Sequence, residues 1–288
     1  MQKIKLFIDL TRLNRPIGYM LLFWPCLWGL ALAYDFNEGV NLFLFYCFLF
    51  FAGSVLMRSA GCIVNDIVDK NFDKSVERTK NRPIASGKIS VSIALIYVII
   101  LCSLAFLVLI NFNYLTIILA IASMPLAFTY PLMKRFTYWP QLFLGVTFNY
   151  GLILGWSSVQ ENLSLTPIIF YLGAIFWTLG YDTIYGYQDI KDDEIIGVKS
   201  TSIKFKNNPK KLLYLCYSIT ILSLILVGVD MKFNLYYFLS IVIITFHLFI
   251  FQISKLNINK PDICLNIFKS NNLLGLLIFL NIMIGKLV

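Results

Sequence analysis

Long apolar segments dominate the chain and alternate with short polar ones. A helix crosses a bilayer with about 20 mostly apolar residues, and nine segments meet that requirement. They are residues 17–35, 42–62, 89–110, 114–131, 139–157, 165–182, 212–229, 235–252 and 271–287. Polar and apolar residues do not alternate with a period of two inside them, which argues against a membrane β-barrel. The pattern predicts an all-α polytopic membrane protein with about nine transmembrane helices.

The composition excludes a soluble domain. Hydrophobic residues make up 59% of the chain and charged residues 14%, whereas soluble chains carry about 25% charged residues. No linker or low-complexity tract divides the sequence, so residues 1–288 are expected to form a single membrane-embedded domain. Two acid-rich loops, each after an apolar segment, are separated by four further segments. This weak repeat predicts that the helices surround a central cavity with the two loops facing each other.

Basic residues set the expected orientation. Of the 24 Lys and Arg residues, 21 fall in alternate loops, and only Lys232 and Lys286 fall on the opposite side. These loops are residues 1–16, 63–88, 132–138, 183–211 and 253–270. Lys and Arg collect in cytoplasmic loops, so the N-terminus and both acidic loops are predicted to be cytoplasmic. The first sixteen residues show no signal or transit pattern, which favours a bacterial plasma (inner) membrane.

The excess of basic over acidic residues does not indicate a nucleic-acid partner. Membrane topology already accounts for the net charge of +9, and no nucleic-acid-binding pattern is present. The six cysteines form no CxxC pair and the single His247 lies within an apolar segment. A zinc site is therefore not expected.

The first acidic cluster follows the second apolar segment. Asn65, Asp69 and Asp73 are spaced i, i+4, i+8 and share one helical face, with Asp66 beside them. Like charges at this spacing repel, and a carboxylate near the bilayer is costly when it is unpaired. A compensating positive charge is therefore required. It could come from Lys and Arg residues around a solvated helix end, or from a metal ion.

The second cluster favours the metal ion. Asp182, Asp189 and Asp193 are spaced i, i+7, i+11, again on one face of a continuous helix, and Asp192 and Glu194 flank them. Mg²⁺ takes oxygen ligands and commonly binds through one or two carboxylates plus substrate phosphates. Two acidic faces therefore predict metal ions that bridge one polyanionic ligand.

Cations interleave with both clusters and indicate the anion. Arg78 and Arg82 follow the first cluster, and Lys199 follows the second. Metal ions and cations together neutralise a departing diphosphate and stabilise the charge that develops on it. The alternative, that these residues are ordinary basic loop residues of a membrane protein, remains open on this pattern alone.

Four segments resemble one family of membrane enzymes. They are Met57–Asp66 continuing to Arg78–Gly87; Tyr181–Tyr185 with Asp189–Asp193 and Gly197–Thr201; Tyr130–Arg135; and Arg15–Gly18 with Trp24-Pro25. Together they resemble the UbiA superfamily of intramembrane prenyltransferases, most closely the members that prenylate 4-hydroxybenzoate in ubiquinone biosynthesis. The resemblance covers residues 12–203, while residues 212–288 match only as apolar segments. Ser202 stands where alanine is expected.

The resemblance implies a reaction and its participants. An Mg²⁺-bound polyprenyl diphosphate ionises, and the resulting allylic cation is attacked by the ring carbon ortho to the hydroxyl of 4-hydroxybenzoate. The isoprenoid tail enters sideways from the lipid bilayer, because its exposure to water is unfavourable. Other enzymes of quinone biosynthesis are possible partners.

The resemblance also assigns roles to residues. The metal ligands are Asn65, Asp69, Asp73, Asp189 and Asp193, and Asp66 and Asp182 complete the catalytic carboxylates. The substrate-binding residues are Arg58, Lys70, Arg78, Arg82, Tyr130, Lys134, Arg135 and Lys199. Among them Lys134, Lys70 and Arg58 are expected to contact the phosphates. Arg135 is expected to bind the benzoate carboxylate, since a guanidinium matches a carboxylate at two points.

Two other functions remain open at this stage. The same superfamily includes enzymes whose acceptor is haem, dihydroxynaphthoate, chlorophyllide or a glycerol phosphate. A cation transporter is the second alternative, and it predicts carboxylates near the bilayer midplane on broken helices. The clustering of the acids at one face argues against the transporter.

Overall fold

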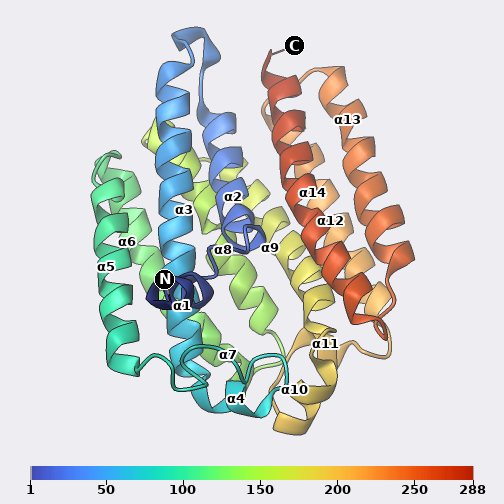
Figure 1. The fold of residues 1–288 in the computed structure, drawn as a ribbon. Helices are drawn as coiled ribbons and strands as arrows, with labels where there is room; N and C mark the ends of the chain where they lie inside the picture. The colour runs from blue at the N-terminus through green and yellow to red at the C-terminus, as the bar shows by residue number, and fades with distance from the viewer. Residues whose placement is uncertain (1, 288) are drawn as a thin grey trace.

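Long helices form a single bundle, and most of the short helices gather at one end of it (Figure 1). The structure is a computed structural model and describes residues 2–287. The long helices are α2 (Ile17–Ala33), α3 (Asn41–Val68), α5 (Val91–Leu109), α6 (Tyr114–Thr129), α8 (Pro140–Gln160), α9 (Leu165–Gly186), α12 (Pro209–Asp230), α13 (Leu235–Thr245) continued by the π-helix η3 (Phe246–Ser254), and α14 (Pro261–Leu287). The short ones are α1 (Gln2–Thr11), α4 (Lys70–Ser75), α7 (Met133–Phe136), α10 (Ile190–Ile196) and α11 (Thr201–Lys204), with 3₁₀ turns η1 (Phe36–Glu38) and η2 (Tyr130–Leu132).

The predicted fold class is confirmed, since a helix occupies each of the nine predicted spans. Eight helices of the described chain are long and apolar enough to cross a membrane. The ninth, α2, has 17 residues and lies at the short end of the spanning range, which is about 17–25 residues.

The last helix is longer than the sequence predicts. Its expected start was residue 271, but α14 begins at Pro261, where a proline fits the first helical turn. Asn271, at the expected start, points into the bundle rather than standing in a loop. Asn271 is fully buried, accepts a hydrogen bond from Trp177 Nε1 at 2.8 Å and another from Gln252 Nε2 at 3.0 Å.

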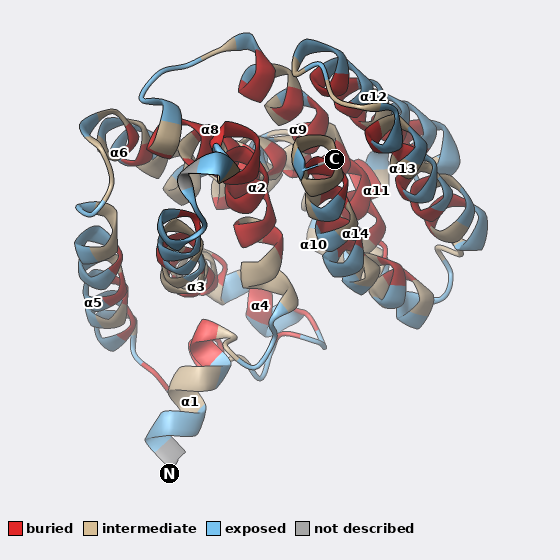
Figure 2. Ribbon diagram, turned by 90° about the horizontal axis from the view of Figure 1, so that it is seen from above, coloured by how far each residue is buried: buried red, intermediate tan, exposed pale blue. Residues whose placement is uncertain are grey.

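Close packing of α2 against α8 forms the centre of the bundle, where buried residues concentrate (Figure 2). Glycines permit this contact. A Cβ atom on Gly29 would lie 2.0 Å from the Leu152 carbonyl oxygen, and one on Gly155 would lie 2.1 Å from the Cys26 carbonyl oxygen. Gly151 and Gly155 form a GxxxG pair, and small residues at this spacing let membrane helices approach backbone to backbone.

Helices α5 and α6 flank this centre on one side (Figure 2). Helix α5 packs on α3, and α6 packs on α8. Their outward faces are apolar and exposed; Ile99, for example, is 65% exposed. Such a face suits contact with lipid chains rather than water.

Both acidic segments lie where a long helix ends. Helix α3 gives way to α4 at Asp69, yet the bonds from Asp69 N to Asn65 O and from Asp73 N to Asp69 O, both 2.8 Å, keep the helical spacing. The second segment differs from the prediction of a continuous helix. Helix α9 ends at Gly186 in tighter turns, including Asp189 N to Gly186 O at 3.3 Å, and α10 begins at Ile190. The single helical face expected for Asp182, Asp189 and Asp193 is therefore wrong.

Candidate active site

A polar cavity of about 340 Å³ opens at the end of the bundle that carries the short helices. The two acidic segments face each other across it, as expected. The cavity also receives residues from the α1–α2 turn, from η2 and α7, and from the start of α8. A backbone bond from Lys199 N to Lys134 O at 2.8 Å ties α7 to the loop after α10, which fixes the wall between the two acidic segments.

Most residues chosen from the sequence line this cavity. They are Arg58, Asn65, Asp69, Asp73, Arg78, Arg82, Tyr130, Lys134, Asp182, Asp189, Asp193 and Lys199. Three others, Asp66, Lys70 and Arg135, lie outside the lining. The fold therefore brings both acidic segments and most of the selected cations to one place.

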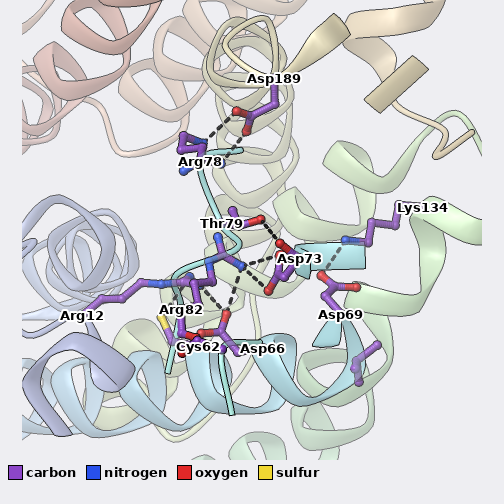
Figure 3. A network of polar contacts seen from close by, with 12 residues as sticks. Arg12, Cys62, Asp66, Asp69, Asp73, Arg78, Thr79, Arg82, Lys134 and Asp189 are labelled. Carbon is purple, nitrogen blue, oxygen red and sulfur yellow. Dashed lines mark hydrogen bonds and ion pairs between the residues drawn. The ribbon is translucent and has the colours of Figure 1, made fainter. Parts of the chain in front are cut away.

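Arginines compensate the charge of the first acidic segment (Figure 3). Asp66 is 1% exposed and forms ion pairs with Arg12 and Arg82. Arg82 Nη1 donates to Asp66 Oδ1 at 3.1 Å and also to Asp73 Oδ1 and Oδ2 at 3.0 and 2.8 Å. One guanidinium nitrogen thus bridges two carboxylates.

A further cation meets the first segment from α7. Lys134 Nζ donates to Asp69 Oδ2, while Asp69 Oδ1 is buried and has no hydrogen-bond partner within the described residues. Burial raises the pKa of Asp69, and Lys134 opposes that rise. The unpartnered oxygen marks a position that a cation could fill.

The second segment is tied to the first by one ion pair (Figure 3). Arg78 Nε donates to Asp189 Oδ1 at 2.7 Å, and Arg78 Nη2 donates to Asp189 Oδ2. Burial and the nearby Asp189 raise the pKa of Asp193 to about 6. Asp182 lines the cavity and forms no ion pair within residues 2–287.

The donor set fits a magnesium ion that shares its coordination with phosphate. Across residues 2–287 no group of three carboxylate, imidazole or thiol side chains is placed to hold a metal ion by itself. Carboxylate oxygens nevertheless line both sides of the cavity, and the second oxygen of Asp69 is unpartnered. Mg²⁺ usually takes one or two carboxylates plus substrate phosphates and water, and these residues match that requirement.

An apolar cavity of about 250 Å³ adjoins the polar one. Arg58, Tyr130 and Phe148 line both cavities and so mark the junction between them. Phe106 of α5 and Ile121 of α6 line the apolar cavity and are each 51% exposed on the outer surface. The apolar cavity therefore reaches the lipid-facing surface between α5 and α6.

Two arginines that the sequence assigns to substrate binding occupy different surroundings. Arg58 stands at the junction, with Cζ 5.5 Å from the Phe148 ring centroid, Nη1 2.9 Å from Cys62 Sγ, and Nε buried without a partner in the described chain. Arg135 donates to the Val68 carbonyl oxygen at 2.7 Å and lies over Phe72, outside the cavity.

Sequence reasoning missed several residues that line the polar cavity. Among them are Arg12, Arg15, Cys62, Gln141, Tyr181 and Tyr185. Arg12 was counted only as a topology charge. Arg15, Cys62, Tyr181 and Tyr185 stand within the family-like segments and could have been found there.

A family profile described as the UbiA prenyltransferase family matches residues 22–273. The chain belongs to this family. Two solved structures share the fold. A UbiA homolog from Aeropyrum pernix K1 matches with a TM-score of 0.77 and 22% identity, and the match covers 94% of this chain and 98% of that one. A UbiA homolog from Archaeoglobus fulgidus bound to GPP and Mg²⁺ matches with a TM-score of 0.70 and 18% identity, and the match covers 98% of this chain and 100% of that one.

Curated relatives match nearly the whole chain. The mitochondrial 4-hydroxybenzoate polyprenyltransferase of Bos taurus is 45% identical over 98% of this chain and 75% of its own length. The enzyme of that name from Drosophila pseudoobscura pseudoobscura is 43% identical over 99% of this chain and 71% of its own length. The enzyme from Homo sapiens is 43% identical over 98% of this chain and 75% of its own length.

These relatives correct the predicted location. They are mitochondrial enzymes of animals, so the assignment to a bacterial plasma membrane with cytoplasmic loops is wrong. That assignment rested on the loop charges and on the absence of a recognisable targeting pattern. Charge asymmetry identifies which loops share a face, but it does not identify the membrane. The multi-pass character itself is supported by the helices described above.

Proposed function

We propose that the chain transfers a polyprenyl group from polyprenyl diphosphate to 4-hydroxybenzoate, at the ring carbon ortho to the hydroxyl, as a step of ubiquinone biosynthesis. The observation that carries this proposal is the meeting of two cavities. A polar cavity bordered by two acidic segments adjoins an apolar cavity that reaches the lipid-facing surface. The relatives named above support the acceptor.

The diphosphate occupies the polar cavity. Arg78, Arg82 and Lys134 pair with carboxylates and would present their remaining N–H groups to phosphate oxygens. Asn65, Asp69 and Asp73 would hold the metal on one side, and Asp189 and Asp193 on the other. When bound, Mg²⁺ would neutralise the leaving diphosphate; the homolog bound to GPP and Mg²⁺ supports the use of this metal. Asp66, outside the lining, acts through Arg82.

Carbon–carbon bond formation takes place at the junction of the cavities. The bond between the first carbon of the prenyl chain and the diphosphate oxygen breaks there, and its electron pair leaves with the diphosphate. Tyr130 and Phe148, whose ring centroids are 6.5 Å apart in an edge-to-face arrangement, border the position of the allylic cation. Aromatic faces attract cations when water is excluded. The tail remains in the apolar cavity, which accounts for lateral entry from the lipid.

The acceptor is oriented by one cation and one anion. Arg58, whose Nε has no partner in the described chain, suits the benzoate carboxylate, because a guanidinium can bind a carboxylate at two points. We therefore assign this role to Arg58 in place of Arg135, which lies outside the cavity. Asp182 accepts the phenol O–H and raises the electron density of the ring. After attack the ring carbon loses its proton to the released diphosphate or to water, which restores aromaticity.

A reconstitution assay tests this function. The purified protein in lipid vesicles is incubated with Mg²⁺, a polyprenyl diphosphate and radiolabelled 4-hydroxybenzoate. The expected product is radiolabelled and extracts into organic solvent, and its formation stops when EDTA is added. Dihydroxynaphthoate serves as the competing acceptor. Prenylation of dihydroxynaphthoate without prenylation of 4-hydroxybenzoate would refute the acceptor assignment.

The relatives support a mitochondrial membrane as the location. Fractionation of cells that express the protein tests this: it should sediment with mitochondrial membranes and resist extraction by alkaline carbonate. Association with other enzymes of quinone biosynthesis remains a prediction.

A further inference from the structure

Arg12 has an unusual backbone conformation at the end of α1. Its φ is +56°, in the left-handed region, which costs a residue with a side chain about 1–2 kcal/mol. Glycine is the residue most often found in that conformation after a helix. Arg15 N donates to Arg12 O at 2.9 Å, so the turn into α2 depends on this conformation. The presence of arginine here calls for a role of its side chain.

The Arg12 side chain reaches the first acidic segment. It forms an ion pair with Asp66, and its Nη1 lies 3.6 Å from Cys62 Sγ. Helix α1 is held in place by Leu10, which is fully buried in a cluster with Ala60 and Ile63 of α3. The position of the guanidinium is thus set by packing that is independent of the ion pair.

Asp66 connects Arg12 to the metal ligands. Arg82 Nη1 lies between Asp66 Oδ1, at 3.1 Å, and Asp73 Oδ2, at 2.8 Å. With Arg12 present, the buried Asp66 has two guanidinium partners. Without Arg12, Asp66 and Asp73 would compete for Arg82, the guanidinium partner that remains among the described residues. An uncompensated buried carboxylate is costly, so Arg82 would move toward Asp66.

We infer that Arg12 is a positioning residue that holds Arg82 and Asp73 in the geometry that binds Mg²⁺ and diphosphate. This inference rests on the proposed function. Arg12 also lines the polar cavity, but its ion pair is with Asp66, so we assign its effect to Asp66 and Arg82. The ion pairs form a chain of alternating charge from the end of α1 to the cavity wall (Figure 3).

The left-handed backbone allows a test that separates the side chain from the fold. Arg12→Gly relieves the backbone strain and removes the guanidinium. Glu161→Gly is the matched control, since Glu161 also has a left-handed φ, +51°, and follows the end of α8 remote from the cavity. Helix α8 has 21 residues, and at 1.5 Å per residue about 30 Å separates its two ends. Arg12→Gln removes the charge but not the strain.

The measurement is the thermal unfolding temperature in detergent, titrated with Mg²⁺ at a fixed concentration of inorganic pyrophosphate. Arg12→Gly should unfold at a higher temperature than Arg12→Gln in the absence of ligand, because both lose the guanidinium and only glycine removes the left-handed strain. Its half-saturating Mg²⁺ concentration should rise about 10–100-fold, the usual effect of removing a residue that orients metal ligands. Arg12→Gln should show the same rise and Arg12→Lys a smaller one. Glu161→Gly should titrate like the wild type.

Three results would overturn the inference. If the wild type responds to Mg²⁺ with pyrophosphate and both Arg12→Gly and Arg12→Gln respond at the same concentrations, Arg12 does not position the site. A rise confined to Arg12→Gly would assign the effect to the turn and would equally contradict the role of the guanidinium. A wild type that shows no response contradicts the proposed function itself, and the role of Arg12 with it.

Discussion

Replacement of Arg58 by Met should separate recognition of the acceptor from recognition of the diphosphate. Arg58 lines the junction of the two cavities, with its guanidinium over Phe148 and its Nε unpartnered in the described chain. Methionine keeps an unbranched apolar side chain there and removes every N–H donor. Arg135→Met is the matched comparison, because Arg135 lies outside the cavity and donates to the Val68 carbonyl oxygen.

The expected loss follows from two charge-assisted hydrogen bonds. A hydrogen bond to a charged group contributes about 1.5–3 kcal/mol, and Arg58 is only partly buried, so the lower value applies. Two bonds then contribute about 3 kcal/mol, and each 1.36 kcal/mol corresponds to a factor of ten in rate. The kcat/KM for 4-hydroxybenzoate should therefore fall about 100-fold in Arg58→Met.

The assay compares two acceptors of similar shape. Initial rates of prenylation are measured with 4-hydroxybenzoate and with its neutral analogue 4-hydroxybenzamide, at saturating prenyl diphosphate. Arg58→Met should lose activity toward the acid selectively, and its KM for the diphosphate should stay close to that of the wild type. Arg135→Met should not change the ratio between acceptors. Equal losses on both acceptors in Arg58→Met, or a selective loss in Arg135→Met, would refute the assignment.

Three further predictions concern the metal, the packing and pH. Asp69→Asn and Asp189→Asn should each abolish turnover while the unfolding temperature stays near that of the wild type, because each removes a proposed metal ligand on a different side of the cavity; near-normal product formation in both would contradict the proposed site. Gly155→Ala should lower the free energy of unfolding by at least about 1–3 kcal/mol, because its Cβ would lie 2.1 Å from a backbone oxygen of α2. Gly53→Ala is the control: the space around its Cβ position is open, so it should unfold like the wild type in the same detergent titration. The pKa of Asp193 is raised to about 6, and a protonated carboxyl cannot bind a metal. The Mg²⁺ concentration that gives half-maximal activity should therefore rise up to about tenfold per pH unit below pH 6. If this concentration is unchanged from pH 7 to 5, Asp193 is excluded as a ligand.

The helices follow from the sequence because the bilayer leaves few alternatives. Backbone groups in hydrocarbon must be paired internally, so a long apolar segment has to be helical wherever it spans. The failure at α14 has a specific cause. Asn271 hydrogen-bonds Trp177 and Gln252 inside the bundle, and polar residues with such distant partners look like loop residues in the sequence.

The site is predictable in its members but less so in its geometry. Helical spacing grouped Asn65, Asp69 and Asp73, because α4 keeps the spacing of α3. The same helical spacing failed for Asp182, Asp189 and Asp193, because the helix ends at Gly186 and no proline signals that end. Arg12 escaped notice because its partner Asp66 lies 54 positions away, and charge counting alone does not pair residues so far apart.

The opening between α5 and α6 determines how the enzyme meets its lipid substrate. Phe106 and Ile121 border the apolar cavity and the bundle surface alike, so the polyprenyl diphosphate arrives by lateral diffusion within the bilayer leaflet. The concentration that governs its rate is then a mole fraction in lipid and not a bulk molarity. Adding inert phospholipid at constant substrate should slow turnover by surface dilution, while the KM for the water-soluble acceptor keeps its ordinary units.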